Sequence, residues 1–212
     1  MNHTSAAPDP AAAMILRMLH AYQERLHGLA HVRDASVLAV QGADVPAAAA
    51  KDWRQVCIAL GVGQVGLPTL LSHAHRLAVL EKDDLQRVLA ARMLIDRRAA
   101  LARCIDGAYL AGLAGLLGEA ALTALTQREH WAPDAGGPLP ALDLAQLAEA
   151  GLHALIADST VSDPSLAQLM RLTIGMQAPV SLCAGTPIAE TQAEAFMATL
   201  PVLFPELSWL FG

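Results

Sequence analysis

Aromatic residues and cysteines are scarce in this chain. Aromatic side chains make up 4% of its 212 residues, although apolar residues make up 54%. The core must therefore consist mainly of Leu, Ala, Val and Met, which favours helices packed on helices over a β-sandwich. The three cysteines, Cys57, Cys104 and Cys183, are widely spaced and form no CxxC pair. We interpret them as free thiols in a reducing compartment.

Basic residues are also few, and long apolar runs are missing. The chain has 14 Lys and Arg residues against 20 Asp and Glu residues, a formal net charge of −6. This balance argues against a nucleic-acid binder, which needs a basic surface. The longest apolar run, 107–118, is shorter than the roughly 20 residues of a transmembrane helix, and no signal peptide is evident. We therefore expect a cytoplasmic protein that does not insert into a membrane.

The segment 76–128 predicts the centre of an all-α fold. Its first half has apolar residues at helical spacing, with Asp83 or Asp84 placed to cap the helix N-terminus. In the second half, a glycine recurs every third residue within a leucine-rich helix, leaving a smooth side that another helix backbone can approach: Gly112, Gly115 and Gly118. We predict two helices joined near Gly107 that form a central hairpin. The arginines of this segment fall largely on faces that meet water or an acidic partner: Arg87, Arg92, Arg97, Arg98 and Arg103.

The whole chain predicts an irregular helical domain of about seven to nine helices around this hairpin. Residues 1–10 are expected to be a flexible arm, 11–65 an N-terminal helical segment and 66–212 a helical core. Within the N-terminal segment, a helix is predicted over 11–32, whereas 53–60 fits either a helix or a buried strand.

Proline marks several predicted helix boundaries. Pro68, Asp163-Pro164 and Thr186-Pro187 fit the starts of helices, and Pro201 is expected to end the last one. The stretch 131–140 is rich in proline and glycine and is predicted to be a loop. The tail that follows Pro201 is so apolar that it must dock on another surface.

A glycine-rich stretch, LGVGQVGLP, matches the GxGxxG pattern of dinucleotide-binding turns through Gly61, Gly63 and Gly66. That turn needs a strand before it and a helix after it, whose backbone N–H groups face a pyrophosphate. Pro68 removes one of those N–H groups, and strands do not alternate with helices downstream. A nucleotide-dependent oxidoreductase that uses the Gly61–Gly66 turn is therefore an alternative reading, not the main one.

Histidines gather on the first predicted helix without forming a metal motif. His20, Glu24, His27 and His31 share one helix face, and the last two have the spacing of a two-histidine clamp. Gly28 stands where a metallohydrolase would place its glutamate, and no later group obviously completes the coordination. We interpret this face as solvated. No GxSxG, Walker-type or paired-carboxylate motif appears, so we predict a non-enzymatic protein without a cofactor.

Three further segments follow one another in an ordered pattern. The first, 85–125, is a leucine-rich pair of helices with an Arg103-Cys104 step between them and a Gly-plus-Leu second half. The second runs from the WAPDAGGPLP loop through a helix with a central Gly151 to Arg171-Leu172-Thr173-Ile174 and then Pro179. The third is the closing sequence LPVLFPELSWLFG, with Pro205, Ser208, Leu210 and Phe211.

In their order and spacing, these segments resemble the SctK family of type III secretion systems, the YscK, PscK, MxiK and OrgA group. The resemblance covers 67–212, and 1–65 match none of its patterns. It implies a non-enzymatic adaptor of the sorting platform below the injectisome. Such an adaptor links the cytoplasmic domain of the SctD-like inner-membrane ring protein to the SctQ-like pod protein. It therefore lies in the cytoplasm, at the inner membrane only through its partners.

We expect the partner contacts at two places. Arg97 and Arg98 are predicted to share an exposed face, and Trp209 and Phe211 lie in the apolar tail. Besides the nucleotide-dependent enzyme, a helical scaffold or chaperone of unrelated ancestry remains an alternative.

Overall fold

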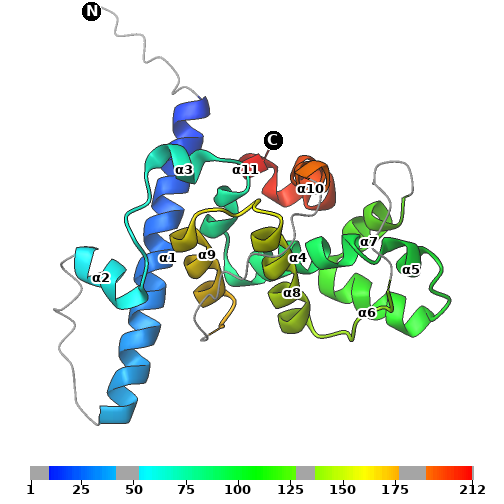
Figure 1. The fold of residues 1–212 in the computed structure, drawn as a ribbon, viewed down its shortest axis with the longest axis horizontal. Coiled ribbons are helices and arrows are strands. Elements are labelled where there is room, and N and C mark those ends of the chain that lie inside the picture. The colour runs from blue at the N-terminus through cyan, green and yellow to red at the C-terminus, as the bar shows by residue number, and fades with distance from the viewer. Residues whose placement is uncertain (1–9, 42–52, 128–136, 177–189, 212) are drawn as a thin grey trace, which may run out of the picture.

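A computed structural model describes residues 10–41, 53–127, 137–176 and 190–211. Within these ranges every regular element is a helix (Figure 1), so the all-α prediction is confirmed. In chain order the α-helices and two 3-10 helices are α1 (Pro10–Gln41), α2 (Trp53–Leu60), α3 (Leu67–Leu71), η2 (His75–Val79), α4 (Lys82–Ile95), α5 (Arg98–Ala102), α6 (Gly107–Leu117), α7 (Glu119–Thr126), α8 (Leu144–Ala157), α9 (Pro164–Thr173), α10 (Glu190–Leu203), η4 (Pro205–Leu207) and α11 (Ser208–Phe211).

Helices α4 and α8 pack against each other in the middle of the body (Figure 1). Their backbones approach closely at Gly151 of α8. A Cβ atom built there would lie 1.8 Å from the carbonyl oxygen of Leu89 on α4, so only glycine allows the contact. Leucines from both helices are completely buried in the core beside it, among them Leu85, Leu94, Leu152 and Leu155.

The structure differs from the expected hairpin in its second half. The leucine-rich stretch after Gly107 forms two helices, α6 and α7, which are bent by 118°. Gly118 lies at the bend with φ +93°, a conformation that glycine adopts readily. A Cβ at Gly112 would meet the side chain of Leu142, and one at Gly115 would have nothing within 4 Å. Within the glycine run, Gly118 therefore marks the break between two helices, and Gly151 provides the close helix contact.

The first helix is longer than predicted and packs on the core. α1 continues to Gln41, past the expected end at residue 32. Its apolar stripe faces the body, where Met18 and Leu26 are fully buried. α1 contacts η2, α9 and α11, and α2 packs on α1. The sequence left open whether 53–60 is a helix or a strand, and the structure makes it a helix.

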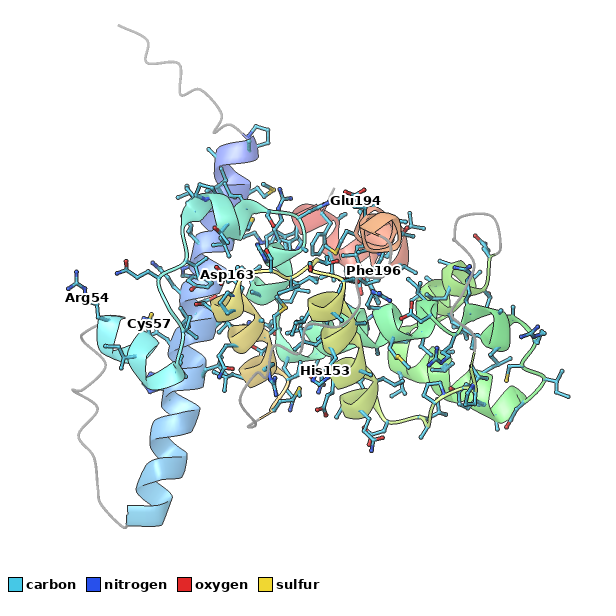
Figure 2. All side chains as sticks on the ribbon, in the orientation of Figure 1. Arg54, Cys57, His153, Asp163, Glu194 and Phe196 are labelled. Carbon is cyan, nitrogen blue, oxygen red and sulfur yellow. The ribbon has the colours of Figure 1, made fainter. Side chains whose placement is uncertain are left out.

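The C-terminal segment folds back onto the body. α10 runs through Pro201, which the sequence predicts as its end, and stops at Leu203. Phe196 of α10 is fully buried near the centre of the molecule (Figure 2). The tail after α10 forms η4 and α11, and Leu210 and Phe211 are buried in the core. The prediction that this tail docks is confirmed, and its docking surface is the protein itself.

Side-chain caps explain where several helices begin. The carboxylate of Asp163 accepts hydrogen bonds from the N–H groups of Ser165 and Leu166, with proline in the first turn, so the predicted start of α9 is confirmed. Two other aspartates cap α6 and α8 in the same way: Asp106 and Asp143.

The predicted cap of α4 is wrong. Glu81 holds the cap position without a side-chain hydrogen bond, and Asp83 and Asp84 lie within the first turn. The first turn is the positive end of the helix dipole, which favours negative charge. For Asp84, burial opposes this effect and raises its pKa. Pro68 does start a helix, but α3 ends at Leu71 and a separate 3-10 turn, η2, follows it.

Arg92 does not lie on a water-facing side of α4, contrary to the prediction. Its side chain is 1% exposed. The apolar stripe of α4 alone does not reveal this, because α8 and the turn after it cover the side of α4 that carries Arg92 and supply a carboxylate to it.

Several predictions fall outside the described residues. They concern the arm 1–10 apart from its last residue, the helix start at Thr186-Pro187 and most of the loop 131–140. In the residues that are described, no single helix is long and apolar enough to cross a membrane; α6 and α7 pass that test only when they are taken together across their bend.

Candidate functional site

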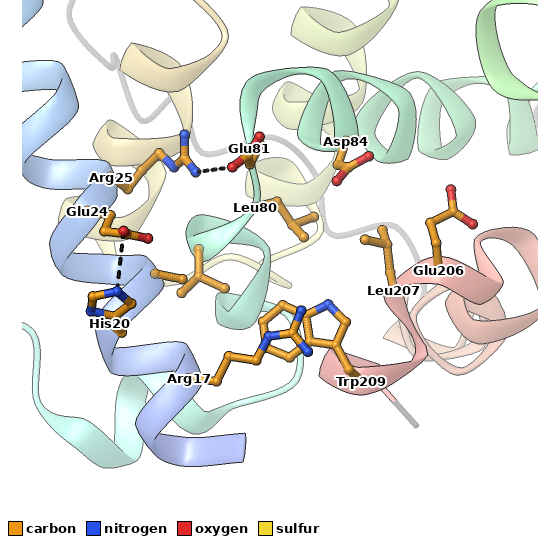
Figure 3. Close-up of a pocket in the computed structure, with 12 residues that line it drawn as sticks. Arg17, His20, Glu24, Arg25, Leu80, Glu81, Asp84, Glu206, Leu207 and Trp209 are labelled. Carbon is orange, nitrogen blue, oxygen red and sulfur yellow. Dashed lines mark ion pairs between the residues drawn. The ribbon is translucent and has the colours of Figure 1, made fainter. Parts of the chain in front are cut away.

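A groove of about 420 Å³ opens where three segments distant in sequence meet (Figure 3). α1 forms one side, the η2–α4 junction forms the floor, and η4 with α11 forms the other side. The groove is lined by Arg17, His20, Ala21, Glu24, Arg25, Val79, Leu80, Glu81, Asp84, Glu206, Leu207 and Trp209.

The indole of Trp209 forms the wall of the groove on the tail side. The guanidinium of Arg17, from α1, lies 3.8 Å from the centre of the indole ring (Figure 3). This cation–π contact joins the first helix to the last one. Trp209 is half-buried and so keeps part of its surface open. The structure therefore places this predicted contact residue in a groove.

Phe211, the second predicted contact in the tail, belongs to the core. Its side chain is 5% exposed, and its ring centre lies 5.8 Å from that of His73. Its carbonyl oxygen is 3.4 Å from Nε2 of His73, and Arg76 donates a hydrogen bond to the carbonyl of Leu210 at 2.8 Å. A partner would reach Phe211 only after the tail leaves this position. That Trp209 and Phe211 bind a partner stays a prediction.

Two glutamates on the rim of the groove are open to solvent. The side chain of Glu24 is 65% exposed and lies 3.3 Å from Nε2 of His20. The side chain of Glu81 is 81% exposed and lies 3.7 Å from the guanidinium of Arg25 (Figure 3). Such exposed pairs are worth at most about 1 kcal/mol each, because water screens them.

Arg87 joins α4 to the tail just behind the rim. Its Nη1 lies 2.9 Å from Glu206 and 3.4 Å from Asp84, and its Nη2 donates a hydrogen bond to the carbonyl of Leu117 at 3.1 Å. Its guanidinium also lies 5.1 Å from the ring centre of Phe204. This one side chain therefore ties together α4, the end of α6 and the tail.

Among the carboxylates near Arg87, Asp84 has a shifted pKa. Burial raises the pKa of Asp84 above its ordinary value; Arg87 lowers it, whereas Glu206, Glu81 and Asp83 raise it further. The ionised form of Asp84 is thus disfavoured in the folded protein.

Arg97 and Arg98 lie at the other end of the body, at the start of α5 (Figure 1). Both are half-buried, not exposed as predicted. Arg97 donates a hydrogen bond to the carbonyl of Asp96, and a Cβ at Gly137 would lie 3.1 Å from its Nε. The structure does not bring these arginines together with Trp209, and their role in binding also stays a prediction.

The GxGxxG stretch does not form a dinucleotide-binding turn. It connects α2 to α3, so a helix stands where that turn needs a strand. The N–H group of Gly63 donates a hydrogen bond to Oγ of Ser165 at 2.9 Å, and α3 has only 5 residues. This geometry does not support the nucleotide-dependent alternative.

On the histidine face of α1, the side chains of His20 and Glu24 are both exposed. This agrees with the interpretation of that part of the face as solvated. In the described parts of the chain, no three His, Cys, Asp or Glu side chains are grouped to hold a metal ion.

The buried His75 lies next to Ser72, but its hydrogen bonds indicate a structural role and not a catalytic one. Nδ1 of His75 lies 3.0 Å from the carbonyl of Thr69, and Nε2 accepts from the N–H groups of Ser162 and Asp163 at 3.2 and 3.3 Å. Nδ1 is therefore the nitrogen that carries the proton. The Ser72 hydroxyl lies 3.0 Å from Nδ1 of His75. His75 could act as a base toward this hydroxyl only if Nδ1 carried no proton.

Two other hollows have different chemistry. One of about 520 Å³ lies beside the α8–α9 turn and includes Asp158, whose charge Arg92 already balances. Another of about 380 Å³ is lined mainly by side chains of α5, α6 and α7, such as Leu110 and Leu122. Neither combines an aromatic wall with a charged rim.

Most residues of the groove were not predicted from the sequence. Trp209 was predicted as a partner contact, and Glu24 was assigned only to the histidine face of the first helix. Glu81 and Glu206 stand 125 positions apart in the chain and belong to no motif. Only the return of the tail onto α1 and α4 brings them together.

Comparison with known proteins identifies the family. The family model described as bacterial type III secretion protein (HrpB4) matches residues 6–206. No curated protein and no solved structure matches the chain. The match supports the predicted link to type III secretion and also covers the N-terminal segment, for which the SctK-like patterns have no counterpart. The chain therefore belongs to the HrpB4 family of bacterial type III secretion proteins.

Proposed function

We propose that the protein is a non-enzymatic adaptor in the cytoplasmic sorting platform of a type III secretion system. In this role it links the cytoplasmic domain of the SctD-like inner-membrane ring protein to the SctQ-like pod protein. The observation that carries the proposal is the family match over residues 6–206, together with the ordered SctK-like segments of the sequence.

The arrangement of the surfaces supports this role. An adaptor needs two separate contact areas on a body that keeps them at a fixed distance. The groove lies where α1 meets the tail and the start of α4, whereas α5, which begins at Arg98, lies on the other side of α4 and α8 from α1 (Figure 1). Between them, α4 and α8 are joined by close backbone contact and by the buried pair of Arg92 and Asp158.

The direct test is a pull-down of the tagged, full-length chain from secreting bacteria. We expect mass spectrometry to find both the pod protein and the ring protein. Retention of neither would refute the proposal, and retention of a secreted effector in their place would favour a chaperone.

The same pull-down tests the arginine end. Reversing both charges with Arg97→Glu and Arg98→Glu should reduce the recovery of one platform protein and leave the other unchanged. Arg103→Glu, at an exposed arginine nearby, is the control against which Arg97→Glu and Arg98→Glu are each compared, since every single reversal changes the net charge equally. Circular dichroism confirms that each variant is folded. Equal recovery of both proteins with the double variant would remove these arginines from the interface.

The nucleotide-dependent alternative has its own test. Titration of the purified chain with NAD(P) or FAD should leave the melting temperature unchanged, because the glycine turn lacks its strand. A reproducible rise would favour the enzyme.

A further inference from the structure

We propose that the groove between α1, α4 and the C-terminal tail binds a segment of a partner protein that carries arginine or lysine side chains. This inference rests on the proposed adaptor function and adds to it the surface and the chemistry of one contact.

Carboxylates outnumber cations around the groove. It is lined by four carboxylates and two guanidinium groups: Glu24, Glu81, Asp84 and Glu206 against Arg17 and Arg25. Behind the rim, Arg87 pairs with Asp84 and Glu206, whereas Asp83 adds a further negative charge near Asp84. Counted together with Arg87 and Asp83, five carboxylates stand against three guanidinium groups, so a basic partner would add favourable charge pairs.

The two most exposed carboxylates are placed to meet such a partner. Glu24 comes from α1 and Glu81 from the start of α4, and their side chains are 65% and 81% exposed. Glu24 has a histidine neighbour, and the guanidinium of Arg25 stays 3.7 Å from Glu81. Both contacts involve an exposed glutamate and are weak, so a partner's cation can compete for Glu24 and Glu81. Deeper in the groove, burial raises the pKa of Asp84, and the neighbouring carboxylates Glu206, Glu81 and Asp83 raise it further against the effect of Arg87.

The aromatic wall fits the same ligand chemistry. The indole of Trp209 already holds the guanidinium of Arg17, at 3.8 Å from the ring centre. The electron-rich face of a neutral aromatic ring next to carboxylates is the combination that recognises guanidinium and ammonium groups. The two other hollows described above lack it. Because carboxylates outnumber guanidinium groups in the lining, the net charge of the groove opposes an acidic segment, and a purely apolar one would leave that charge unpaired.

Photo-crosslinking in secreting bacteria tests the inference with the full-length chain. A photoreactive amino acid replaces Ala21, which lines the groove, and mass spectrometry identifies the crosslinked segment. We expect a segment that contains several arginines or lysines. Reversing the rim charges with Glu24→Lys and Glu81→Lys should lower the yield of this adduct about tenfold.

The matched control is Glu119→Lys with Glu149→Lys, the same change in net charge at two exposed glutamates outside the groove. Its adduct yield should stay within about twofold of the unsubstituted chain, since distant surface charges are screened. Glu81 makes no capping hydrogen bond, so the rim variant should fold, and its melting temperature checks this.

Three results would overturn the inference: no adduct at position 21, an adduct with a segment that has no basic residue, or equal yields from the rim variant and its control. The identity of the captured protein tests the proposed function separately. A basic segment from a protein other than the pod or ring protein would support the groove and contradict the proposed pair of partners.

Discussion

Nη2 of Arg92 donates a hydrogen bond to Oδ2 of Asp158 at 3.0 Å, and both side chains are almost completely buried. Arg92 lies on α4 and Asp158 caps the end of α8. Nη1 of Arg92 also pairs with Asp96 at 2.9 Å, and Asp158 accepts hydrogen bonds from the backbone N–H and the hydroxyl of Thr160. The two central helices are thus joined by a buried ionic network as well as by apolar packing.

Removing one member of this network should be strongly destabilising. Asp158→Asn leaves the buried charge of Arg92 with only Asp96 to balance it, and we expect the free energy of unfolding to fall by about 3 kcal/mol. Urea denaturation followed by circular dichroism measures this value. Asp96→Asn is the control, because Asp96 is 17% exposed and water can compensate part of its loss. Equal effects of the two substitutions would contradict the central role of Asp158.

Gly151 should tolerate no side chain. In Gly151→Ala the new methyl group would meet the backbone carbonyl of Leu89, so α4 and α8 must separate, at an expected cost of about 3 kcal/mol in unfolding free energy. Gly115→Ala is the matched control, because nothing lies within 4 Å of that position and alanine favours the helix by about 1 kcal/mol. Thermal unfolding of both variants should therefore show shifts of opposite sign. Shifts of the same sign would disprove the close contact.

Tyr22 should make stability depend on pH in the alkaline range. Burial raises its pKa from 10.0 to about 12, and Cys57 and Asp163 add to the shift. Because the folded pKa is above the unfolded one, the neutral phenol contributes stability that is complete below pH 10 and is lost as the pH rises towards 12. Tyr22→Phe should lose less stability over this window than the unsubstituted chain, as measured by urea denaturation at several pH values. Parallel curves would show that Tyr22 is not the cause.

Asp84 should show the corresponding effect in acid. Its folded pKa is raised, so protonated Asp84 contributes stability that is present below the unfolded pKa and is lost as the pH rises through the folded pKa. Asp84→Asn should therefore raise the unfolding free energy slightly at neutral pH, because solvent screens this partly exposed group, and the difference should disappear in acid. Asp83→Asn, in the same turn but more exposed, is the control. A stability difference that persists in acid would argue against the raised pKa.

Local signals in the sequence predicted local structure well. The Asp163-Pro164 step starts α9, and the stripe that contains Met18 and Leu26 faces the core. Predictions failed where a distant segment decides the outcome. Arg92 is buried because α8 brings Asp158 to it, and Phe211 is buried because the tail folds back. The groove could not be predicted either, since its carboxylates come from α1, α4 and η4 and share no motif.

The all-α class and the link to type III secretion were already indicated by the sequence, since helical periodicity, caps and ordered motifs are properties of neighbouring residues. Tertiary structure alone decided which glycine brings two helices together, which arginine is buried and which carboxylates share a groove. Close contact, desolvation and excess charge arise only between residues that folding brings together, and no spacing along the chain encodes them directly.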